Sequence, residues 1–190
     1  MPTRGRLAQL VERHIDIVEV SEVRALYRPP ALFGQYSSFD RRYIMPAPQP
    51  VPLLSCNDPV QLARDLVGTP YCYSATLEDA PQVFNCYTFT QWIIYARHGI
   101  LLPCYPEDQY AYELCAPAEL DGLQRLDLVF TSGTARKCPF PIGHVGLATG
   151  ENTIIHATNE YGKNKGGVFE ISLDEFLTRR TYKGARRFLL

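Results

Sequence analysis

The chain has 190 residues, of which 46% are hydrophobic, enough to bury one sizeable core with an appended segment but short for two full domains. Its 19 lysines and arginines nearly balance 20 aspartates and glutamates, so it lacks the one-sided basic charge that nucleic-acid-binding proteins present to phosphates. No apolar stretch approaches the roughly 20 residues of a membrane span, and the longest near the middle covers only residues 92–96.

Residues 1–52 are predicted to form an accessory segment. A short helix is expected at 7–15 and a strand at 15–20, and the proline-rich run at 45–52 is typical of an extended connector. Charged residues interrupt any hydrophobic signal-like stretch near the N-terminus, so no signal peptide is visible. The compartment is left open between the cytoplasm and export by a signal-independent route, and the main domain is expected to span 53–190.

The main domain is expected to open with two helices. Asp58 is a suitable N-cap and Pro59 fits the first helical position, while Gly68 closes this helix at its C-terminal side. After a loop, apolar residues recur at intervals of three and four, which predicts a second helix that begins at or just before Cys86 and ends at Gly99.

From Leu126 onward, short strands separated by turns are predicted. The expected strands cover residues 126–131, 144–149, 153–158 and 168–172, followed by a short helix at 173–180 and a closing strand at about 184–189. Two helices followed by an antiparallel sheet is the order of an α+β domain.

The cysteine pattern indicates neither a metal nor a cofactor site. The six cysteines are Cys56, Cys72, Cys86, Cys104, Cys115 and Cys138. Their spacings contain no CxxC pair, which disfavours structural zinc. Free buried thiols are the simplest expectation, and one or two disulfides in an oxidising compartment are the alternative.

Cys86 is the candidate nucleophile. A thiol reacts as its thiolate, and the N-terminus of a helix stabilises negative charge through its free N–H groups. The unassisted thiol pKa of about 8.5 leaves only a few per cent ionised at neutral pH, so a histidine partner is needed. His14 lies in the accessory segment, and His98 lies at the far end of the helix that Cys86 starts, roughly 18 Å away.

That leaves His144 and His156, on two strands that should pair as a hairpin around a short turn. If Gly150 is near the centre of the turn, the two histidines lie at opposed positions on one face of the sheet. One imidazole can then orient the other, which serves as the base for Cys86. A cysteine at a helix start or a histidine in a strand is, on its own, more often structural, so the combination favours catalysis.

These residues resemble the motifs of the NlpC-type cell-wall peptidases, papain-like enzymes that cleave the peptide stems of bacterial peptidoglycan. The resemblance covers roughly residues 58–189. The family's Asp-Cys-Ser-Gly helix entry is similar to residues 85–88, its Gly-Ile-x-Leu-Pro to 99–103, its Leu-x-x-Gly-Asp-Leu-Val-Phe to 123–130, and its His-Val-Gly-Ile and Ile-His-Ala to 144–147 and 155–157. Leu126 stands where that family has a glycine.

The resemblance implies a papain-like α+β fold with N-terminal helices packed on an antiparallel sheet, a peptide or muropeptide substrate, and no cofactor. It implies that Cys86 is the nucleophile, His144 the general base and His156 the third catalytic residue. Tyr71 matches a tyrosine that lines the family's site, and its hydroxyl would join the backbone N–H of Cys86 in an oxyanion hole. An ordinary loop tyrosine is the alternative for Tyr71.

Two residues beside the nucleophile depart from the family pattern. Asn85 replaces an aspartate and Tyr87 a serine, at positions that in the family help hold the free amino end of the stem peptide. Losing the carboxylate removes a charge-assisted contact with that amino end, worth about 1.5 to 3 kcal/mol, which is enough to change the preference for such a substrate tenfold. Tyr71, Asn85 and Tyr87 are therefore the candidate substrate-binding residues, and a changed substrate preference is expected.

The main hypothesis is a cysteine peptidase or amidase that cleaves stem peptides or related isopeptides through an acyl-enzyme on Cys86. The alternatives are an acyltransferase of the same fold and a non-catalytic binding or assembly module that retains the fold. The sequence indicates no partner protein.

Overall fold

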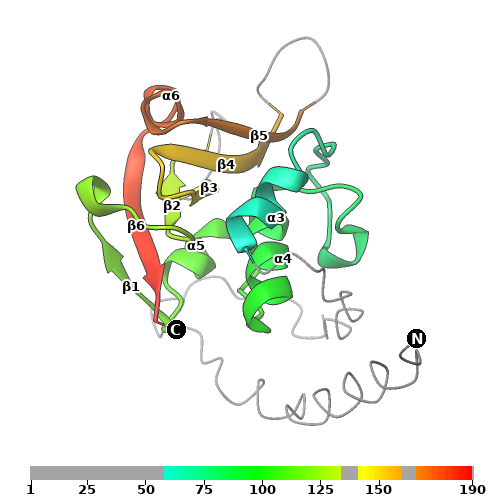
Figure 1. Cartoon of the computed structure of the whole chain (residues 1–190), viewed down its shortest axis with the longest axis horizontal. Coiled ribbons are helices and arrows are strands. Elements are labelled where there is room, and N and C mark those ends of the chain that lie inside the picture. Colours follow the sequence, from blue (N-terminus) through cyan, green and yellow to red (C-terminus); the bar gives the residue numbers. More distant parts are fainter. Residues whose placement is uncertain (1–57, 134–140, 160–165, 190) are drawn as a thin grey trace, which may run out of the picture. The chain divides into compact units, whose positions relative to one another are not determined.

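The computed structural model describes residues 58–133, 141–159 and 166–189 (Figure 1). The expected accessory segment, with its helix, strand and proline-rich run, lies outside these ranges, so the division at residue 52 stays a prediction. Within the described ranges, no helix has the length and apolar character needed to cross a membrane. Among the four cysteines they contain, Cys72, Cys86, Cys104 and Cys115, no two are joined by a disulfide.

The first described helix, α3, spans Pro59–Asp65 and confirms the predicted cap. The Asp58 carboxylate accepts a hydrogen bond from the Val60 backbone N–H at 2.9 Å, which satisfies one of the free donors of the first turn. The helix ends three residues before Gly68, which adopts a positive φ of 92° and donates its N–H to the Val168 carbonyl at 2.9 Å. Gly68 thus ends the turn after α3 and joins it to the sheet.

The second helix, α4, spans Cys86–His98, as predicted. Asn85 caps it through a reciprocal pair of bonds: its side-chain oxygen accepts from the Thr88 N–H, and the Thr88 hydroxyl accepts from the Asn85 N–H, both at 2.9 Å. Gly99 ends the helix in the left-handed conformation with φ 66°. These local bonds fix the residue at which the helix begins, and that residue is Cys86.

The sheet has six antiparallel strands in the order β1-β6-β2-β3-β4-β5 (Figure 1). The strands are β1 Cys115–Ala118, β2 Leu128–Thr131, β3 His144–Ala148, β4 Thr153–Thr158, β5 Gly167–Ser172 and β6 Tyr182–Phe188. The predicted meander is confirmed as β2 to β5, and the closing strand returns beside β2. The shorter elements are the helices α5 Pro106–Tyr110 and α6 Leu173–Thr178 and the 3-10 turns Leu77–Asp79 and Leu120–Gly122.

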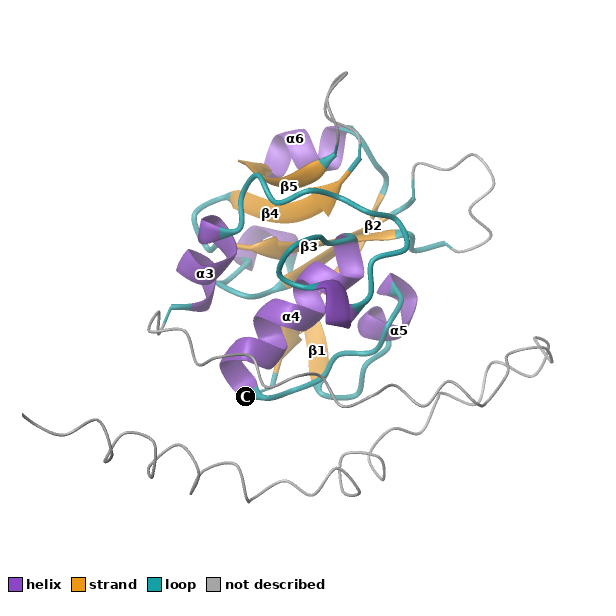
Figure 2. Cartoon of the chain, turned by 90° about the vertical axis from the view of Figure 1, so that its right-hand side faces the viewer, coloured by secondary structure: helices purple, strands orange, loops and turns teal. Residues whose placement is uncertain are grey.

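The two faces of the sheet carry separate hydrophobic clusters. Val145 and Ile155 face α4 and pack with its buried side chains. Ala148 and Ile154, which alternate with them along β3 and β4, pack with Phe176 of α6. Figure 2 shows α4 and α6 on opposite sides of these strands. The helix that begins at Cys86 is therefore held against the sheet by an extensive buried core.

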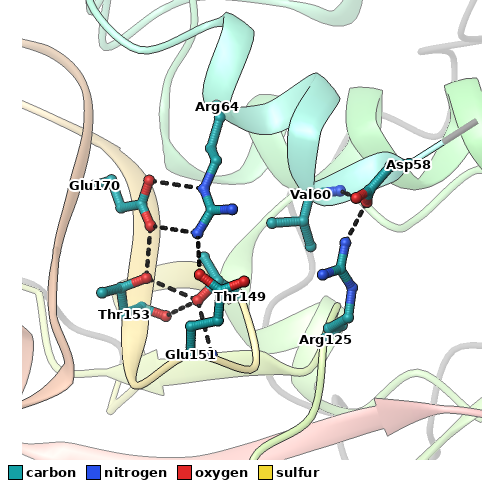
Figure 3. Close-up of polar contacts among 8 residues, drawn as sticks. All are labelled: Asp58, Val60, Arg64, Arg125, Thr149, Glu151, Thr153 and Glu170. Carbon is teal, nitrogen blue, oxygen red and sulfur yellow. Dashed lines mark hydrogen bonds and ion pairs between the residues drawn. The ribbon is translucent and has the colours of Figure 1, made fainter. Parts of the chain in front are cut away.

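An ion-pair network joins α3 to the sheet (Figure 3). Arg64 donates two hydrogen bonds to the Glu170 carboxylate, at 3.0 and 3.1 Å, and a third to Glu151 at 2.7 Å. Glu170 lies on β5 and Glu151 in the turn between β3 and β4, while a second ion pair joins Asp58 to Arg125. The network holds α3 against the hairpin that carries both candidate histidines.

The backbone conformation of Leu126 is one that favours glycine, the residue that the resembling family has at this position. Its φ is 70°, a left-handed conformation that is unfavourable for a residue with a β-carbon and free for glycine. The backbone is held there because the Leu126 N–H donates to the Ala148 carbonyl at 2.9 Å. The turn before β2 is therefore retained here with a leucine side chain.

Candidate active site

Cys86 begins α4 and is buried, with 8% of its surface exposed. Burial raises the pKa of its thiol to about 11, although backbone hydrogen bonds at Val145, Tyr87 and Cys86 itself oppose the shift. The bonds at Cys86 and Tyr87 are those expected from the first turn of a helix, and the bond at Val145 places the sulfur against β3. The resting thiol is therefore protonated at neutral pH.

The two candidate histidines are hydrogen-bonded to each other. His144 Nε2 and His156 Nδ1 lie 2.8 Å apart, and the two rings are nearly perpendicular at 80°. Leu147 pairs with Ile155, so the hairpin is centred on Glu151 and not on Gly150. The directly opposed arrangement, expected for a turn centred on Gly150, is therefore wrong. The two histidines are instead diagonal neighbours on one face of the sheet. Their side chains are long enough to bridge the diagonal.

Phe176 of α6 packs against both imidazoles. Its ring centroid lies 5.8 Å from that of His144 and 5.1 Å from that of His156. Gly146, between the histidines on this face, makes room for this contact: a β-carbon there would lie 2.5 Å from Ile154 and 3.2 Å from Phe176. The glycine of the His-Val-Gly motif thus allows an aromatic ring to pack beside the histidine pair.

Burial keeps both histidines neutral. The pKa of His144 lies well below its usual value, and that of His156 is lowered to about 3, in both cases first through burial and then through the positive charge of Arg180. Since Nε2 of His144 is engaged with His156, Nδ1 is the ring nitrogen left to accept a proton from a thiol. The pair therefore presents one usable base.

Cys86 meets the histidine pair at the start of β3. Its sulfur is bonded to the backbone of Val145, the residue that follows His144. No hydrogen bond joins Cys86 to His144 in the described part of the chain, so proton transfer requires the sulfur to approach Nδ1. Catalytic hydrogen bonds commonly tighten only when substrate binds. The structure thus brings the two histidines into contact and places the cysteine beside the same strand.

Asn85 is buried, with 1% of its surface exposed, and its side chain is held by the protein. In addition to capping α4, its amide nitrogen donates to the carbonyls of Ala75 at 2.9 Å and Tyr73 at 3.3 Å. These bonds fasten the preceding loop to the helix start. A direct contact of Asn85 with substrate stays a prediction, whereas its positioning of Cys86 follows from the geometry.

Tyr71 and Tyr87 both lie near the nucleophile. Tyr71 forms a bridge with Phe84, two residues before Cys86, and is half-buried. Burial raises the pKa of Tyr71 and of Tyr87, and the charge of Cys86 contributes in the same direction to both. The Tyr87 ring also packs against Tyr105, with centroids 5.6 Å apart. Two aromatic side chains therefore lie near the thiol, and one of them, Tyr87, stands where the resembling family has a serine.

Arg180 lies at the same site and was missed in the sequence. It is 8% exposed, and its Nη2 donates to the Thr158 hydroxyl at 3.1 Å. Its charge lowers the pKa of Cys86 and of both histidines. No local pattern indicates this position, because Arg180 ends a stretch that resembles the basic last turn of a helix.

The described residues also form a hollow of about 200 Å³ away from these side chains. It is bordered by Leu123, Gly150 and Leu173, near the turn between β3 and β4, so it lies at the opposite end of β3 from His144. Cys86, His144 and His156 do not line it. Within the described ranges, no three His, Cys, Asp or Glu side chains are arranged to hold a metal ion.

A buried neutral histidine makes stability depend on pH. The pKa of His156 is lowered to about 3, so between about pH 3 and 6.5 the unfolded chain binds a proton that the folded chain does not. The free energy of unfolding should therefore fall as the pH is lowered through this window, by up to about 1.4 kcal/mol per pH unit for each such histidine. In urea denaturation from pH 4 to 7, His156→Asn should reduce this slope, and an unchanged slope would show that His156 is protonated in the folded state.

Comparisons with known proteins converge on one family. The profile of the NlpC/P60 family matches residues 68–182. Two probable endopeptidases of Corynebacterium glutamicum are similar: one is 34% identical over 60% of this chain and 49% of its own length, the other 35% identical over 53% and 41%. The crystal structure of an NlpC/P60 family protein from Bacillus cereus superposes with a TM-score of 0.55 at 27% identity, over 70% of this chain and 40% of that one. The chain thus spans about half the length of the curated relatives it matches, or less.

Proposed function

The chain belongs to the NlpC/P60 family, and from this premise we propose that it is a cysteine peptidase with Cys86 as nucleophile, His144 as base and His156 as orienting residue. The observation that carries the proposal is the 2.8 Å contact between the histidines, beside the strand whose backbone meets the Cys86 sulfur. The names of the two Corynebacterium relatives support endopeptidase activity.

The reaction begins with removal of the thiol proton. His144 Nδ1 accepts it as the sulfur attacks the carbonyl carbon of the scissile amide, because the raised thiol pKa disfavours a free thiolate in the resting site. His156 Nδ1 accepts a hydrogen bond from His144 Nε2–H, which fixes the tautomer of His144 whose own Nδ1 is unprotonated. The same bond stabilises the imidazolium that His144 becomes. The pair therefore takes the role of base and orienting group.

The tetrahedral intermediate then collapses to an acyl-enzyme. Its oxyanion accepts a hydrogen bond from the backbone N–H of Cys86, the first residue of α4. The C–N bond breaks as the imidazolium of His144 returns its proton to the leaving amine. Water, deprotonated by the same nitrogen, attacks the thioester carbonyl. The C–S bond then breaks, the imidazolium of His144 returns the proton to the Cys86 sulfur, and the acid product is released.

The proposed substrate is a stem peptide of peptidoglycan or a related isopeptide. The family assignment supports this class, and the neutral, fully engaged Asn85 beside Tyr87 favours a ligand other than a free amino end. Purified chain is to be incubated with a muropeptide digest and the products separated by liquid chromatography with mass detection. Cleavage at an amide bond is expected, and unchanged muropeptides would contradict the proposal.

Tyr71→Phe tests the second oxyanion donor. If the phenol donates to the oxyanion, its loss should lower kcat about 10- to 100-fold with little change in KM, because the bond forms only in the transition state. Tyr112→Phe is the matched control. It also removes a partly buried phenol, but from the segment between α5 and β1. Equal kcat values for Tyr71→Phe and wild type would leave Tyr71 as a packing residue.

A further inference from the structure

Gln109 of α5 places a fully buried amide against the start of α4. Its Nε2 donates hydrogen bonds to the carbonyl of Tyr87 at 3.2 Å and to the carbonyl of Pro103 at 3.0 Å. Its Oε1 accepts from the hydroxyl of Thr90 at 2.8 Å. Because carbonyl oxygens only accept, these partners fix which end of the amide faces them. Gln109 therefore joins the first turn of α4 to the segment before α5 through one planar group.

Tyr87 connects this amide to the nucleophile. Its backbone N–H donates to the sulfur of Cys86, the residue before it, while its carbonyl is the group that Gln109 holds. The N–H and the carbonyl of one residue are separated by only two rotatable bonds, so holding the carbonyl restricts the direction of the N–H. The Tyr87 ring also packs against Tyr105, which lies just before α5. Two contacts with the region around α5 thus hold the residue that follows the nucleophile.

The first turn of a helix needs such support when its N–H groups have a function. These groups lack partners within the helix, and helix ends fray. Asn85 holds the turn from its N-terminal side through the Thr88 N–H. Gln109 holds it from the opposite side, through the carbonyl of Tyr87. A small displacement of the N–H groups would weaken their bonds to the sulfur and to the proposed oxyanion.

We propose that Gln109 is a positioning residue for Cys86, whose amide keeps the N–H groups of the first turn of α4 directed at the sulfur and at the oxyanion. The inference rests on the proposed function and adds to it a residue that acts through the backbone of Tyr87. Gln91 provides the contrast. It is also a buried glutamine, and its Nε2 donates to the Leu102 carbonyl at 2.8 Å, so it holds the segment after α4 from the second turn of the helix. A purely structural role would make the two glutamines equivalent.

The rate at which iodoacetamide alkylates Cys86 at neutral pH tests this inference without turnover. Gln109→Met keeps an unbranched side chain of similar length and removes both donated bonds. The rate at Cys86, relative to that at Cys115, should fall about three- to tenfold, the range of one hydrogen bond to the thiolate. General loosening of the fold would act in the opposite direction, because it would expose the buried Cys86. An unchanged or higher relative rate would overturn the inference.

Gln91→Met is the matched control, because it removes a buried glutamine that holds the same segment. It should leave the relative alkylation rate within about twofold of wild type. An equal fall in both variants would overturn the inference, since it would assign the effect to packing between α4 and α5.

Thr90→Val provides a milder variant for the case in which Gln109→Met does not fold. It replaces a hydroxyl by a methyl group and removes the donor to Gln109 Oε1. The hydroxyl also lies 2.9 Å from the Tyr87 carbonyl, so the same carbonyl loses a contact. The relative alkylation rate at Cys86 should fall in the same direction but by less than threefold. With Gln109→Met unfolded by circular dichroism, a wild-type rate in folded Thr90→Val would overturn the inference.

Steady-state kinetics on muropeptides provides a second readout. Gln109→Met should lower kcat about tenfold and leave KM within about twofold, because the buried amide aligns reacting groups and is closed to the substrate. A higher KM with unchanged kcat would overturn the inference. Muropeptides left uncleaved by wild type would contradict the proposed function alone, because the alkylation rates still report whether Gln109 positions the groups around Cys86.

Discussion

Cys86→Ala should abolish turnover of muropeptides, with a loss of about 10⁴-fold or more in kcat. The replacement removes the only sulfur that lies both at the start of α4 and against β3, and no neighbouring group within the described residues is a substitute nucleophile. The free energy of unfolding should change little, because the alanine keeps the helical position and Asn85 still caps the helix. Activity is to be followed by mass spectrometry of muropeptide products, and folding by circular dichroism.

Cys115→Ala is the matched control. Cys115 is also a free, partly buried thiol whose pKa burial raises to about 11, but it lies on the edge strand β1. Its replacement should leave kcat within about twofold of wild type. Retained amide cleavage by a folded Cys86→Ala protein would contradict the assignment of the nucleophile.

His144→Ala should lower kcat/KM by about 10²- to 10⁴-fold, the usual contribution of a general base. The effect is expected at neutral pH, because burial lowers the pKa of His144 and leaves its ring neutral and able to accept a proton. The loss should fall mainly on kcat, because the base acts in the transition state. Initial rates at several muropeptide concentrations separate kcat from KM.

His98→Ala controls for the loss of an imidazole. His98 ends α4, at the opposite end of the helix from Cys86, and should not affect kcat/KM. If His144→Ala and His98→Ala gave equal rates, the base would have to be sought elsewhere. His156→Asn should give an intermediate loss, since its amide can still accept from His144 Nε2–H while carrying less of the imidazolium charge.

The parts of the fold that depend on neighbouring residues could be predicted from the sequence. The cap at Asp58 and the end of α4 at Gly99 rest on bonds within a few residues. The meander from β2 to β5 follows from short alternating strands and tight turns. These local features were enough to place Cys86 at a helix start and the two histidines on paired strands.

Features that depend on distant contacts could not be predicted in the same way. Strand β1 contains Pro117, which interrupts a strand pattern, and it forms because β6 offers a partner at the edge of the sheet. The register of the histidine hairpin depends on turn geometry: the hairpin is centred on Glu151, one residue after Gly150, so the pairing is shifted by two residues from the directly opposed arrangement. Arg180 reaches the site only because the chain returns to β2 after α6.

The surroundings of the nucleophile also combine features that neighbouring residues determine with features that distant contacts determine. The motif comparison identified Asn85 as a changed residue, but the sequence could not show that its amide would hold the loop carbonyls of Tyr73 and Ala75. Those bonds tie a residue next to the nucleophile to a loop ten residues earlier. Its structural role therefore became visible only once the loop was placed against the helix.

The most direct test of the account is the rate at which iodoacetamide alkylates individual cysteines near neutral pH, resolved by peptide mass spectrometry. Burial raises the pKa of both Cys86 and Cys115 to about 11, so intrinsic acidity does not distinguish them. If His144 takes the Cys86 proton, Cys86 should react at least tenfold faster than Cys115 in wild type, and His144→Ala should remove the difference. Equal rates for the two thiols in wild type, unaffected by His144→Ala, would contradict a catalytic cysteine at this site and favour a binding module that retains the fold.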